Sequence, residues 1–453
     1  MSTGVDAARL AALHQREVER FVAERPRSAA MFEHAKEHLH GGVPMSWMAK
    51  WPGPYPVFVE SAHGAHFTCV DGIDHVDLCL GDTGAMVGHS PEATVARVRE
   101  QVGRGITAML PTADASVAAE ELSRRFGLPQ WQFTLSATDA NRHVIRYARH
   151  VTGRHKVLVI DWCYHGTVDE TFATLEGDTV VPRRGNIGAP VPPSETTVVV
   201  PFNDIPALER ALATGDVACA LLEPAMTNIG IVLPDPGYHE ALRRLTREHG
   251  TILVMDETHT LCAGPGGCTA AWGLEPDVVV VGKTIGAGIP AGAFGFTAEL
   301  SDRIRRSVEL EDIDVGGIGG TLAGNALSLA AVATTLTEVL TDEAFERMEA
   351  LAVRWTDGVQ SVLDSTGAPW HVTRIGCRAE YAFSPHPPHD GAEAAAADDF
   401  ALQQYLHLHA LNRGLLLTPF HNMALMSPAT TEADVDRHTQ AFAECAGELF
   451  AGQ

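Results

Sequence analysis

The chain has 453 residues, of which 45% are hydrophobic and 20% charged, and its formal net charge is -24. This composition is typical of a folded globular protein and excludes a disordered chain. The acidic balance argues against nucleic acid and anionic membranes as partners, because both bind basic surfaces. The length predicts one large domain plus a smaller one.

The eight cysteines are scattered and contain neither a CxxC pair nor a Cys/His grouping with zinc spacing, so we expect no metal site. Free thiols favour a reducing cytoplasm. The first residues have charges spread through them, unlike a signal peptide. No stretch approaches the roughly 18 apolar residues that a membrane span needs.

At the N-terminus, residues 1–40 are predicted to be helical, with an apolar row on one side formed by Leu10, Leu13, Val18 and Phe21. An ordinary surface helix explains this row. Residues 41–61 are predicted to be a loop, since they are rich in Gly, Pro and aromatic residues. Asp71-Gly72 predicts a hairpin turn.

The next informative stretch is residues 133–154, where a strand is predicted to end at Leu135 and a helix to follow. The join reads Ser136-Ala137-Thr138-Asp139. Backbone N–H groups and a hydroxyl at a helix N-terminus form an anion site. A simple helix N-cap is the alternative for this join.

Further strands are predicted within residues 156–172 and 219–234. Tyr164 and His165 follow the first strand, and Asn228 lies after the second. An aromatic residue at a strand exit either stacks on a ligand or packs in the core.

Two apolar runs then end on charged residues. Ile252–Met255 leads to Asp256, and Val278–Val281 leads to Lys283 through one glycine. Short β-branched runs are typical of buried parallel strands, whose C-terminal ends carry ligands in open α/β sheets. A lysine that forms a Schiff base and a carboxylate that keeps a pyridine nitrogen protonated would suit pyridoxal phosphate. Each residue alone is more commonly a solvated side chain or a helix cap.

The motifs DETHT and GKTIGAGIPAGAFG resemble the signature of class III aminotransferases of fold type I, and are most similar to the branch of glutamate-1-semialdehyde aminomutases and β-amino-acid aminotransferases. The resemblance implies an α/β fold, with a mostly parallel seven-stranded sheet flanked by helices in the large domain. We place this pyridoxal-phosphate domain at residues 70–335. Residues 1–69 would supply the substrate loop and part of a small α/β domain, which residues 336–453 complete.

The resemblance also assigns roles. Lys283 and Asp256 would be catalytic. The remaining cofactor contacts would be Ser136, Ala137, Thr138, Tyr164, His165, Asn228, Thr258, His259 and Thr321. Relatives usually have glycine and glutamate where Ala137 and Asp139 stand, so we expect an altered phosphate loop. Tyr164 and Thr258 would cover opposite ring faces, and Asn228 favours the aminomutase branch. For His259, a bond to the cofactor's phenolic oxygen and plain packing remain equal alternatives.

Thr321 resembles a threonine that reaches the phosphate in the other subunit. This implies a homodimer with shared active sites, which could pair into a tetramer. From about residue 335 we expect a long amphipathic helix. Residues 386–399 are predicted to be a flexible insertion.

The substrate side departs from the family. The stretch 418–428 and the first loop contain no arginine, the residue best suited to bind a carboxylate. The candidates for substrate contact are therefore Trp47, Met48, Arg378 and His421. The alternative for Arg378, which we slightly favour, is a structural role as the partner of Glu380 or another acid. We expect a transaminase that moves an amino group from a bulky or aromatic amine or β-amino acid to a carbonyl acceptor. A semialdehyde-type 2,1-aminomutase and an amino-acid epimerase are the alternatives.

Overall fold

The computed structural model describes residues 3–307 and 317–451. Two compact units divide the chain. Unit 1 comprises Met1–Pro91, Glu343–Pro387 and Ala396–Gln453, and unit 2 comprises Glu92–Asp342 and Pro388–Ala395. Residues 70–91 thus belong to unit 1. Within the described ranges, no helix has the length and apolar character needed to cross a bilayer.

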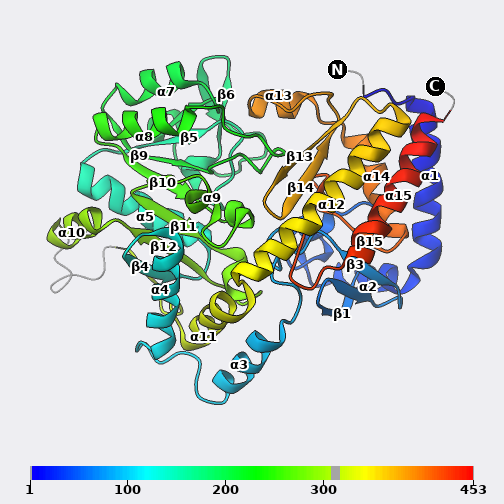
Figure 1. Ribbon diagram of the computed structural model, residues 1–453, viewed down its shortest axis with the longest axis horizontal. Coiled ribbons are helices and arrows are strands. Elements are labelled where there is room, and N and C mark those ends of the chain that lie inside the picture. Colours follow the sequence, from blue (N-terminus) through cyan, green and yellow to red (C-terminus); the bar gives the residue numbers. More distant parts are fainter. Residues whose placement is uncertain (1–2, 308–316, 452–453) are drawn as a thin grey trace. The chain divides into compact units, whose positions relative to one another are not determined.

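Unit 2 is built on a seven-stranded sheet with strand order β4-β12-β11-β10-β9-β5-β8 (Figure 1). The strand β12 is antiparallel to both of its neighbours, and the other pairs are parallel. In chain order the strands are β4 (Gln130–Thr134), β5 (Lys156–Ile160), β8 (Thr197–Val200), β9 (Val217–Leu222), β10 (Ile252–Asp256), β11 (Val278–Val281) and β12 (Gly292–Phe296). This mostly parallel seven-stranded sheet, flanked by helices, confirms the architecture predicted for the large domain.

Helices surround this sheet, and α5 packs on β9, β11 and β12 while α8 packs on β10. A small hairpin, β6 (Ala173–Glu176) and β7 (Thr179–Pro182), lies outside the main sheet. The helices of the unit are α3 (Glu92–Val102), α4 (Ala113–Phe126), α5 (Ala137–Thr152), α6 (Pro193–Thr196), α7 (Ile205–Leu212), α8 (Tyr238–Glu248), α9 (Gly267–Ala271), α10 (Ala298–Ser307), α11 (Ala326–Thr334) and α13 (Gly391–Ala396).

The central strands form because their side chains are apolar on both faces. Every residue of β9, β10 and β11 is buried, as parallel strands covered by helices require. The preceding helix α5 begins at a serine cap and ends at Gly153, whose φ of 68° suits a glycine stop. The strand before this helix, β4, ends at Thr134, one residue before the predicted end at Leu135.

Unit 1 contains a four-stranded sheet, order β1-β2-β3-β15, and a three-stranded sheet, order β13-β14-β16. The predicted turn at Asp71-Gly72 is confirmed, because β2 and β3 pair as antiparallel strands on either side of it. The strands are β1 (Val59–His63), β2 (His66–Cys69), β3 (Asp74–Asp77), β13 (His371–Ile375), β14 (Arg378–Ala382), β15 (Leu415–Leu416) and β16 (Met423–Leu425). The helices are α1 (Ala7–Glu24), α2 (Pro26–Ala35), α12 (Asp342–Thr366), α14 (Phe400–Asn412) and α15 (Glu432–Phe450).

The stretch predicted to be helical, residues 1–40, contains two helices, α1 and α2, with a break between them at Arg25. Proline at position 26 excludes helical geometry for the residue before it and opens a new helix instead. Arg25 has φ -127° and is fully buried, with its guanidinium bound to Asn412 Oδ1 and to the carbonyl of Leu411. The break thus lets a charged side chain anchor α1 to α14.

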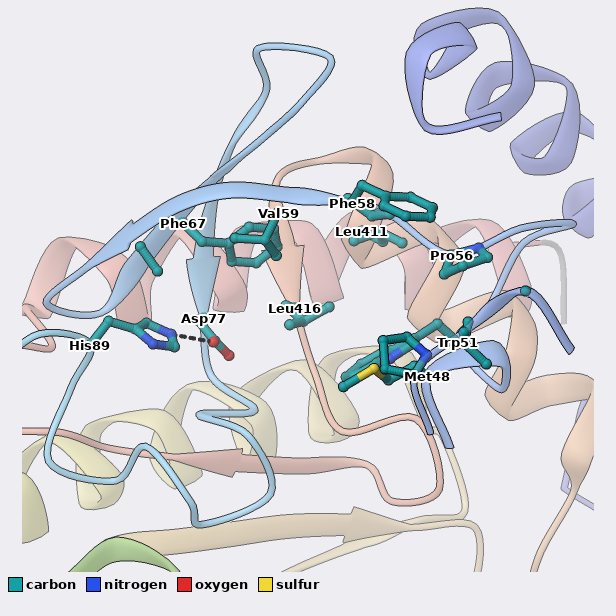
Figure 2. Close-up of a pocket in the computed structure, with 15 residues that line it drawn as sticks. Met48, Trp51, Pro56, Phe58, Val59, Phe67, Asp77, His89, Leu411 and Leu416 are labelled. Carbon is teal, nitrogen blue, oxygen red and sulfur yellow. Dashed lines mark hydrogen bonds and ion pairs between the residues drawn. The ribbon is translucent and has the colours of Figure 1, made fainter. Parts of the chain in front are cut away.

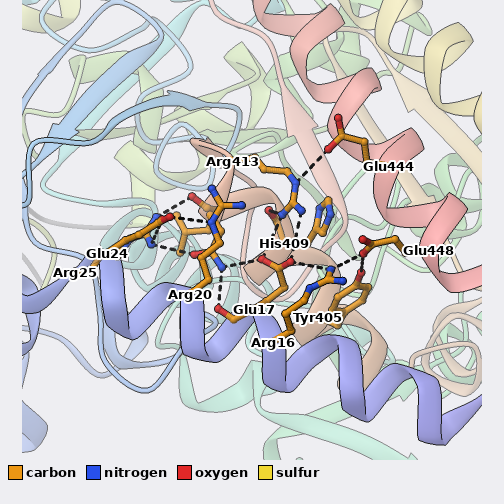
Figure 3. A network of polar contacts seen from close by, with 12 residues as sticks. Arg16, Glu17, Arg20, Glu24, Arg25, Tyr405, His409, Arg413, Glu444 and Glu448 are labelled. Carbon is orange, nitrogen blue, oxygen red and sulfur yellow. Dashed lines mark hydrogen bonds and ion pairs between the residues drawn. The ribbon is translucent and has the colours of Figure 1, made fainter.

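The contact between α1 and α14 is polar as well as apolar (Figure 3). Glu17 is 1% exposed and accepts hydrogen bonds from Asn412 Nδ2 at 2.9 Å and Arg413 Nη1 at 3.2 Å. Burial alone would raise the pKa of Glu17, but these donors and the nearby charge of Arg413 lower it overall. The carboxylate of Glu17 is therefore ionised in the folded protein at neutral pH.

Two other expectations need correction. The helix expected from residue 335 is interrupted, because a π-helical turn (Thr335–Val339) ends α11 and α12 begins only at Asp342. The segment expected to be a flexible insertion contains the helix α13. The backbone at Gly391 lies close to Trp162 and Met226 of unit 2, because an added Cβ would be within 3 Å of both side chains. The small side chains of that alanine-rich stretch suit a helix.

Candidate active site

The two charged residues at the centre of the sequence motifs lie at the same edge of the unit 2 sheet. Asp256 is the last residue of β10, and Lys283 follows β11 after one glycine. The strands are parallel, with Asp256 opposite Val280. The prediction that both residues lie at strand C-terminal ends is confirmed, and this is the edge where open α/β sheets bind ligands.

Asp256 is 3% exposed and is held by three donors. His165 Nδ1 and Asn141 Nδ2 each lie 2.9 Å from Oδ2, and the backbone N–H of Thr258 lies 3.1 Å from Oδ1. Burial would raise the pKa of Asp256, but the hydrogen bond and charge of His165, with help from Thr258 and Asn141, lower it to about 2. The carboxylate is therefore ionised at neutral pH, and Oδ1 retains a lone pair for another donor.

His165 is the charged partner of this carboxylate. It is buried, which opposes its protonation, but the hydrogen bond to Asp256 raises its pKa to about 10. The imidazolium donates its Nδ1–H to Asp256 and, because it is already protonated, cannot act as a base. Its position is fixed by the loop after β5, where Asn141 also donates to the His165 carbonyl at 3.2 Å.

Asn141 was not singled out from the sequence, although a signal was present. It lies four residues after Ala137 on α5, on the buried face that also carries Val144, Ile145 and Ala148. A polar amide on an otherwise apolar helix face requires a buried partner. Here that partner is Asp256.

The neighbouring carboxylate, Glu257, has a different task. It is fully buried, and it accepts hydrogen bonds from Thr260 Oγ1 and from the backbone N–H groups of Cys268 and Thr269. It therefore caps the first turn of α9 and fixes the loop after β10. Of the two acids in DETHT, Asp256 is the one placed beside other ionisable groups of the site.

The turn at the start of α5 is packed tightly against three glycines. A Cβ on Gly282 would lie 2.9 Å from the Ala137 Cβ, and one on Gly292 would lie 2.5 Å from the Ser136 carbonyl. A Cβ on Gly166, where φ is 78°, would overlap Thr138. Three chain segments therefore approach this turn more closely than any side chain would permit.

Within the turn, Ser136 is the N-cap and its hydroxyl accepts from Asp139 N at 3.2 Å. The N–H groups of Ala137 and Thr138 belong to the first helical turn, where the helix supplies no acceptor. Such groups, with the positive end of the helix dipole, can hold a phosphate. The N-cap and anion-site interpretations of Ser136 are thus compatible.

Tyr164 and Asn228 lie on loops that meet at Trp162. Asn228 Nδ2 donates to the Trp162 carbonyl at 2.9 Å, and Trp162 has φ 66°. The half-buried ring of Tyr164 is 6.4 Å from the ring of Phe172 in an edge-to-face arrangement. Asn228 therefore orients the loop that carries Tyr164 and His165, whereas contact of either residue with a cofactor stays a prediction.

Lys283 has a close partner at this edge. Its Nζ lies 2.7 Å from Nε2 of His259, the residue before the short 3₁₀ helix that follows DETHT. Lys283 also has φ 50°, in the left-handed region that side chains other than glycine rarely adopt. Glycine at 282 and the 3₁₀ turn Lys283–Gly286 accommodate this bend.

These residues fit pyridoxal phosphate. The α5 turn offers donors for a phosphate, Asp256 offers an ionised oxygen for a protonated ring nitrogen, and Lys283 offers an amine for the aldehyde. The buried hydroxyl of Thr258 has no hydrogen-bond partner among the described residues. A polar group left without a partner in this way suits a site completed by a ligand.

Thr321 is exposed in the chain, between the glycines Gly319 and Gly320 and the helix α11. Its predicted contact with the phosphate of a second subunit stays a prediction.

The candidate substrate residues belong to unit 1. Trp47 packs edge-to-face on Phe420, with ring centroids 4.2 Å apart. Met48 lines an apolar cavity of about 430 Å³ together with Phe58, Phe67 and Leu411 (Figure 2). On the wall of that cavity, His89 Nε2 lies 2.8 Å from Asp77 Oδ2.

Arg378 and His421 lie on either side of Glu380. The guanidinium of Arg378 is fully buried, with Nη2 3.7 Å from Glu380 Oε2, and His421 Nδ1 lies 3.4 Å from Oε1. Burial would raise the pKa of Glu380, but His421 and then Arg378 lower it. This arrangement favours the structural alternative for Arg378, and a substrate role stays a prediction for both residues.

Comparison with known proteins agrees with this chemistry. The family model "Aminotransferase class-III" matches residues 47–445. A glutamate-1-semialdehyde 2,1-aminomutase from Anaeromyxobacter dehalogenans is 32% identical over 430 residues, covering 92% of this chain and 98% of the relative.

Solved structures give the same picture. A glutamate-1-semialdehyde-aminomutase from Pseudomonas aeruginosa PAO1 is 47% identical and covers 98% of this chain and 100% of that chain, with a TM-score of 0.97. An omega-transaminase from Sphaerobacter thermophilus is 28% identical and covers 93% of this chain and 97% of that chain, with a TM-score of 0.84. The predicted cofactor and fold are confirmed. The chain belongs to the class III aminotransferase family of pyridoxal-phosphate-dependent enzymes.

Proposed function

We propose that the protein is a 2,1-aminomutase, which moves an amino group between adjacent carbon atoms of a small amino aldehyde. From the sequence alone we expected an intermolecular transaminase, with the 2,1-aminomutase as the first alternative, and we now prefer that alternative. The observation that carries the proposal is the 47% identity to the Pseudomonas aeruginosa aminomutase across nearly the whole chain. The placement of Lys283 and Asp256 at adjacent strand ends supports it, because amino exchange needs both groups.

Bound pyridoxal phosphate would supply an aldehyde that links to amines and a ring that draws electrons from the substrate carbon. Asp256 would hold the ring nitrogen protonated through Oδ1. His165 and Asn141 keep this carboxylate charged and fixed through Oδ2. They act as positioning residues, since they reach the ring only through Asp256.

Lys283 would move protons. Its amine would take a proton from one substrate carbon and would return a proton at the end of the transfer, as a general base and then a general acid. In an aminomutase, the carbon that loses the amino group and the carbon that gains one belong to the same substrate molecule. Excluding a second amine and a second carbonyl compound is then the task of the residues around the site.

The remaining cofactor contacts form part of the proposal. Ser136, Ala137 and Thr138 would bind the phosphate through the start of α5, and Thr321 of a second subunit would complete that site in a homodimer. Tyr164 and Thr258 would cover the two ring faces. The free hydroxyl of Thr258 supports its contact with the cofactor.

An intermolecular transaminase remains the second candidate, and the first loop favours it. Residues 41–58 contain no arginine and present Trp47 and Met48 instead, so a substrate carboxylate lacks its usual bidentate partner there. The similarity to an omega-transaminase and to a β-phenylalanine aminotransferase from Variovorax paradoxus, 26% identical over 97% of this chain, supports this candidate. The substrate would then be an apolar or aromatic amine in contact with Trp47, Met48 and His421.

One experiment separates the two. The cofactor-loaded protein is incubated with glutamate 1-semialdehyde alone, and in parallel with a panel of amines and β-amino acids, and products are identified by mass spectrometry and NMR. The isomer with its amino group moved from carbon 2 to carbon 1, formed without a second amine or carbonyl, establishes the aminomutase. Stoichiometric release of a ketone or oxo acid from the panel, with no isomerisation, overturns it in favour of the transaminase. Lys283→Ala is the inactive control for both.

A further inference from the structure

The contact between Lys283 and His259 joins two groups that can each carry a proton. The distance of 2.7 Å between Nζ and Nε2 is at the short end of hydrogen-bond lengths. At this separation one proton lies between the nitrogen atoms, since two facing N–H groups would repel each other. The donor is either an N–H of Lys283 or the Nε2–H of His259.

The backbone holds His259 in this position on both sides. Thr258 N donates to Asp256 Oδ1 at 3.1 Å, and Thr260 Oγ1 donates to Glu257 Oε2 at 2.5 Å. Leu261 N donates to the Glu257 carbonyl at 2.9 Å. The imidazole therefore emerges from a loop anchored immediately before and after it.

The other ionisable groups of this sheet edge are engaged elsewhere. Asp256 binds His165, and Glu257 binds Thr260 and the start of α9. Glu223, at the end of β9, accepts from the backbone and the hydroxyl of Thr227. Burial raises the pKa of Glu223 and of Glu257. Among these groups, His259 is the one shown within hydrogen-bond distance of the lysine amine.

We propose that His259 is a second catalytic acid–base group, which exchanges a proton directly with Lys283 during the reaction. In the first step the neutral Lys283 amine takes a proton from the substrate carbon. The substrate C–H bond would break and an Nζ–H bond would form, and bound pyridoxal phosphate would supply the electron sink for the bonding pair. In the second step that proton moves from Nζ to Nε2, which leaves a neutral amine and an imidazolium.

The pair then returns the proton in reverse order to the second carbon. This inference rests on the proposed function, and it deepens it, because amino exchange within one molecule makes the same lysine serve two carbons. A histidine that stores the proton keeps the amine neutral when it must act as a base. The alternatives are a hydrogen bond to the cofactor's phenolic oxygen and simple packing, and neither needs the imidazole to change its protonation.

The variants His259→Gln and His259→Phe separate these roles. Glutamine keeps a hydrogen-bond donor and acceptor but cannot store a proton, whereas phenylalanine keeps only bulk. His150→Gln, at an exposed position near the other end of α5, is the matched control. The readout is the rate of a single turnover, in which an excess of an amine substrate converts the bound cofactor to its amine form.

Proton carriage predicts a fall of roughly 100-fold in both His259 variants, the lower limit for general acid–base catalysis, with the control unchanged. Added imidazole should restore part of the rate in a His259→Ala variant. If His259→Gln keeps wild-type rates while His259→Phe does not, the histidine only donates a hydrogen bond and the proposal is overturned. Wild-type rates in both variants also overturn it.

A measurement without cofactor or substrate tests the pair itself. In cofactor-free protein with 15N-labelled histidine, NMR should show Nε2 of His259 engaged in a hydrogen bond. Lys283→Met should abolish that signature, and an unchanged signal contradicts the contact. Because this result needs neither an aminomutase substrate nor a His259 variant, failure of the proposed function and failure of the proton pair are distinguishable.

Discussion

Nδ2 of Asn141 lies 2.9 Å from Oδ2 of Asp256, and the hydrogen bond between them links the helix α5 to the end of β10. The same helix begins at the turn that would hold the phosphate. The helix α5 therefore aligns the two ends of the proposed cofactor site. Its cap Ser136 and Asn141 are about five residues apart, and each helical residue rises about 1.5 Å along the axis.

Replacing Asn141 should loosen the cofactor before it affects the fold. In Asn141→Leu the amide is lost while the volume is similar, so we expect the affinity for pyridoxal phosphate to fall about tenfold, the equivalent of one hydrogen bond to a charged group. The dissociation constant can be measured by titrating cofactor-free protein. Asn186→Leu, on a loop whose amide binds the carbonyl of Phe172, is a control for loss of an amide elsewhere in unit 2. Equal losses in both variants would count against a specific role.

The pair formed by Asp256 and His165 predicts a defined pH window of stability. The pKa of Asp256 is lowered to about 2 from 3.8, so its contribution is present above pH 3.8 and disappears as the pH falls towards 2. The pKa of His165 is raised to about 10 from 6.5, so its contribution is full below pH 6.5 and disappears as the pH rises towards 10.

Urea unfolding of cofactor-free protein tests this window. The difference in unfolding free energy between wild type and His165→Gln should be constant from pH 5 to 6.5 and should shrink steadily up to pH 10. A difference that grows above pH 6.5 would reverse the predicted sign.

The close contact between Gly166 and Thr138 predicts a large effect from one methyl group. A Cβ at Gly166 would lie 2.9 Å from the Thr138 Cβ and closer still to its hydroxyl. Gly177 has a similar φ of 60° with nothing within 4 Å of its Cβ, so Gly177→Ala measures the backbone cost alone. We expect Gly166→Ala to be less stable than Gly177→Ala by about 2 kcal/mol, which is typical of overpacking, and to bind phosphate-bearing cofactor more weakly. Equal unfolding free energies for the two variants would show that the turn yields to the added methyl group.

In unit 1, Glu17 should contribute far more to the free energy of unfolding than the exposed Glu19 on the same helix. Glu17→Ala leaves Arg413 and Asn412 without their acceptor, so we expect a loss of about 3 kcal/mol, as for other broken buried ion pairs. Because the pKa of Glu17 is lowered, this difference should be present at neutral pH and should shrink as the pH falls below about 4.5. Chemical denaturation of Glu17→Ala and Glu19→Ala at pH 7 and pH 4 measures this difference in stability. A difference that does not depend on pH would mean that packing alone is lost.

Arg378 offers a test of substrate binding against structure. If the arginine only compensates Glu380, Arg378→Met should destabilise the protein by about 3 kcal/mol, and Arg378→Met with Glu380→Met should regain most of that loss. If it binds the substrate instead, KM should rise in the single variant and remain raised in the double variant. Unfolding and KM measured on the same preparations separate the two.

The sequence predicted the sheet edge well because its signals are local. Runs of valine and isoleucine that stop at Asp256 and Lys283 define where strands end, and the parallel pairing then brings those ends together. Asn141 escaped notice because its significance depends on a partner 115 residues away. The break at Arg25 was missed although Pro26 signals it, because the prediction was based on an apolar row that ends at Phe21. The proximity of His259 to Lys283 depends on loop conformations that no periodicity encodes.

The left-handed backbone of Lys283 has a consequence for stability. A lysine at φ 50° costs about 1 kcal/mol or more relative to glycine, the residue that adopts this conformation freely. Lys283→Gly should therefore raise the melting temperature of the cofactor-free protein even as it removes the reactive amine. The residue that would supply the reactive amine is thus also one at which the backbone lowers the stability of the folded chain.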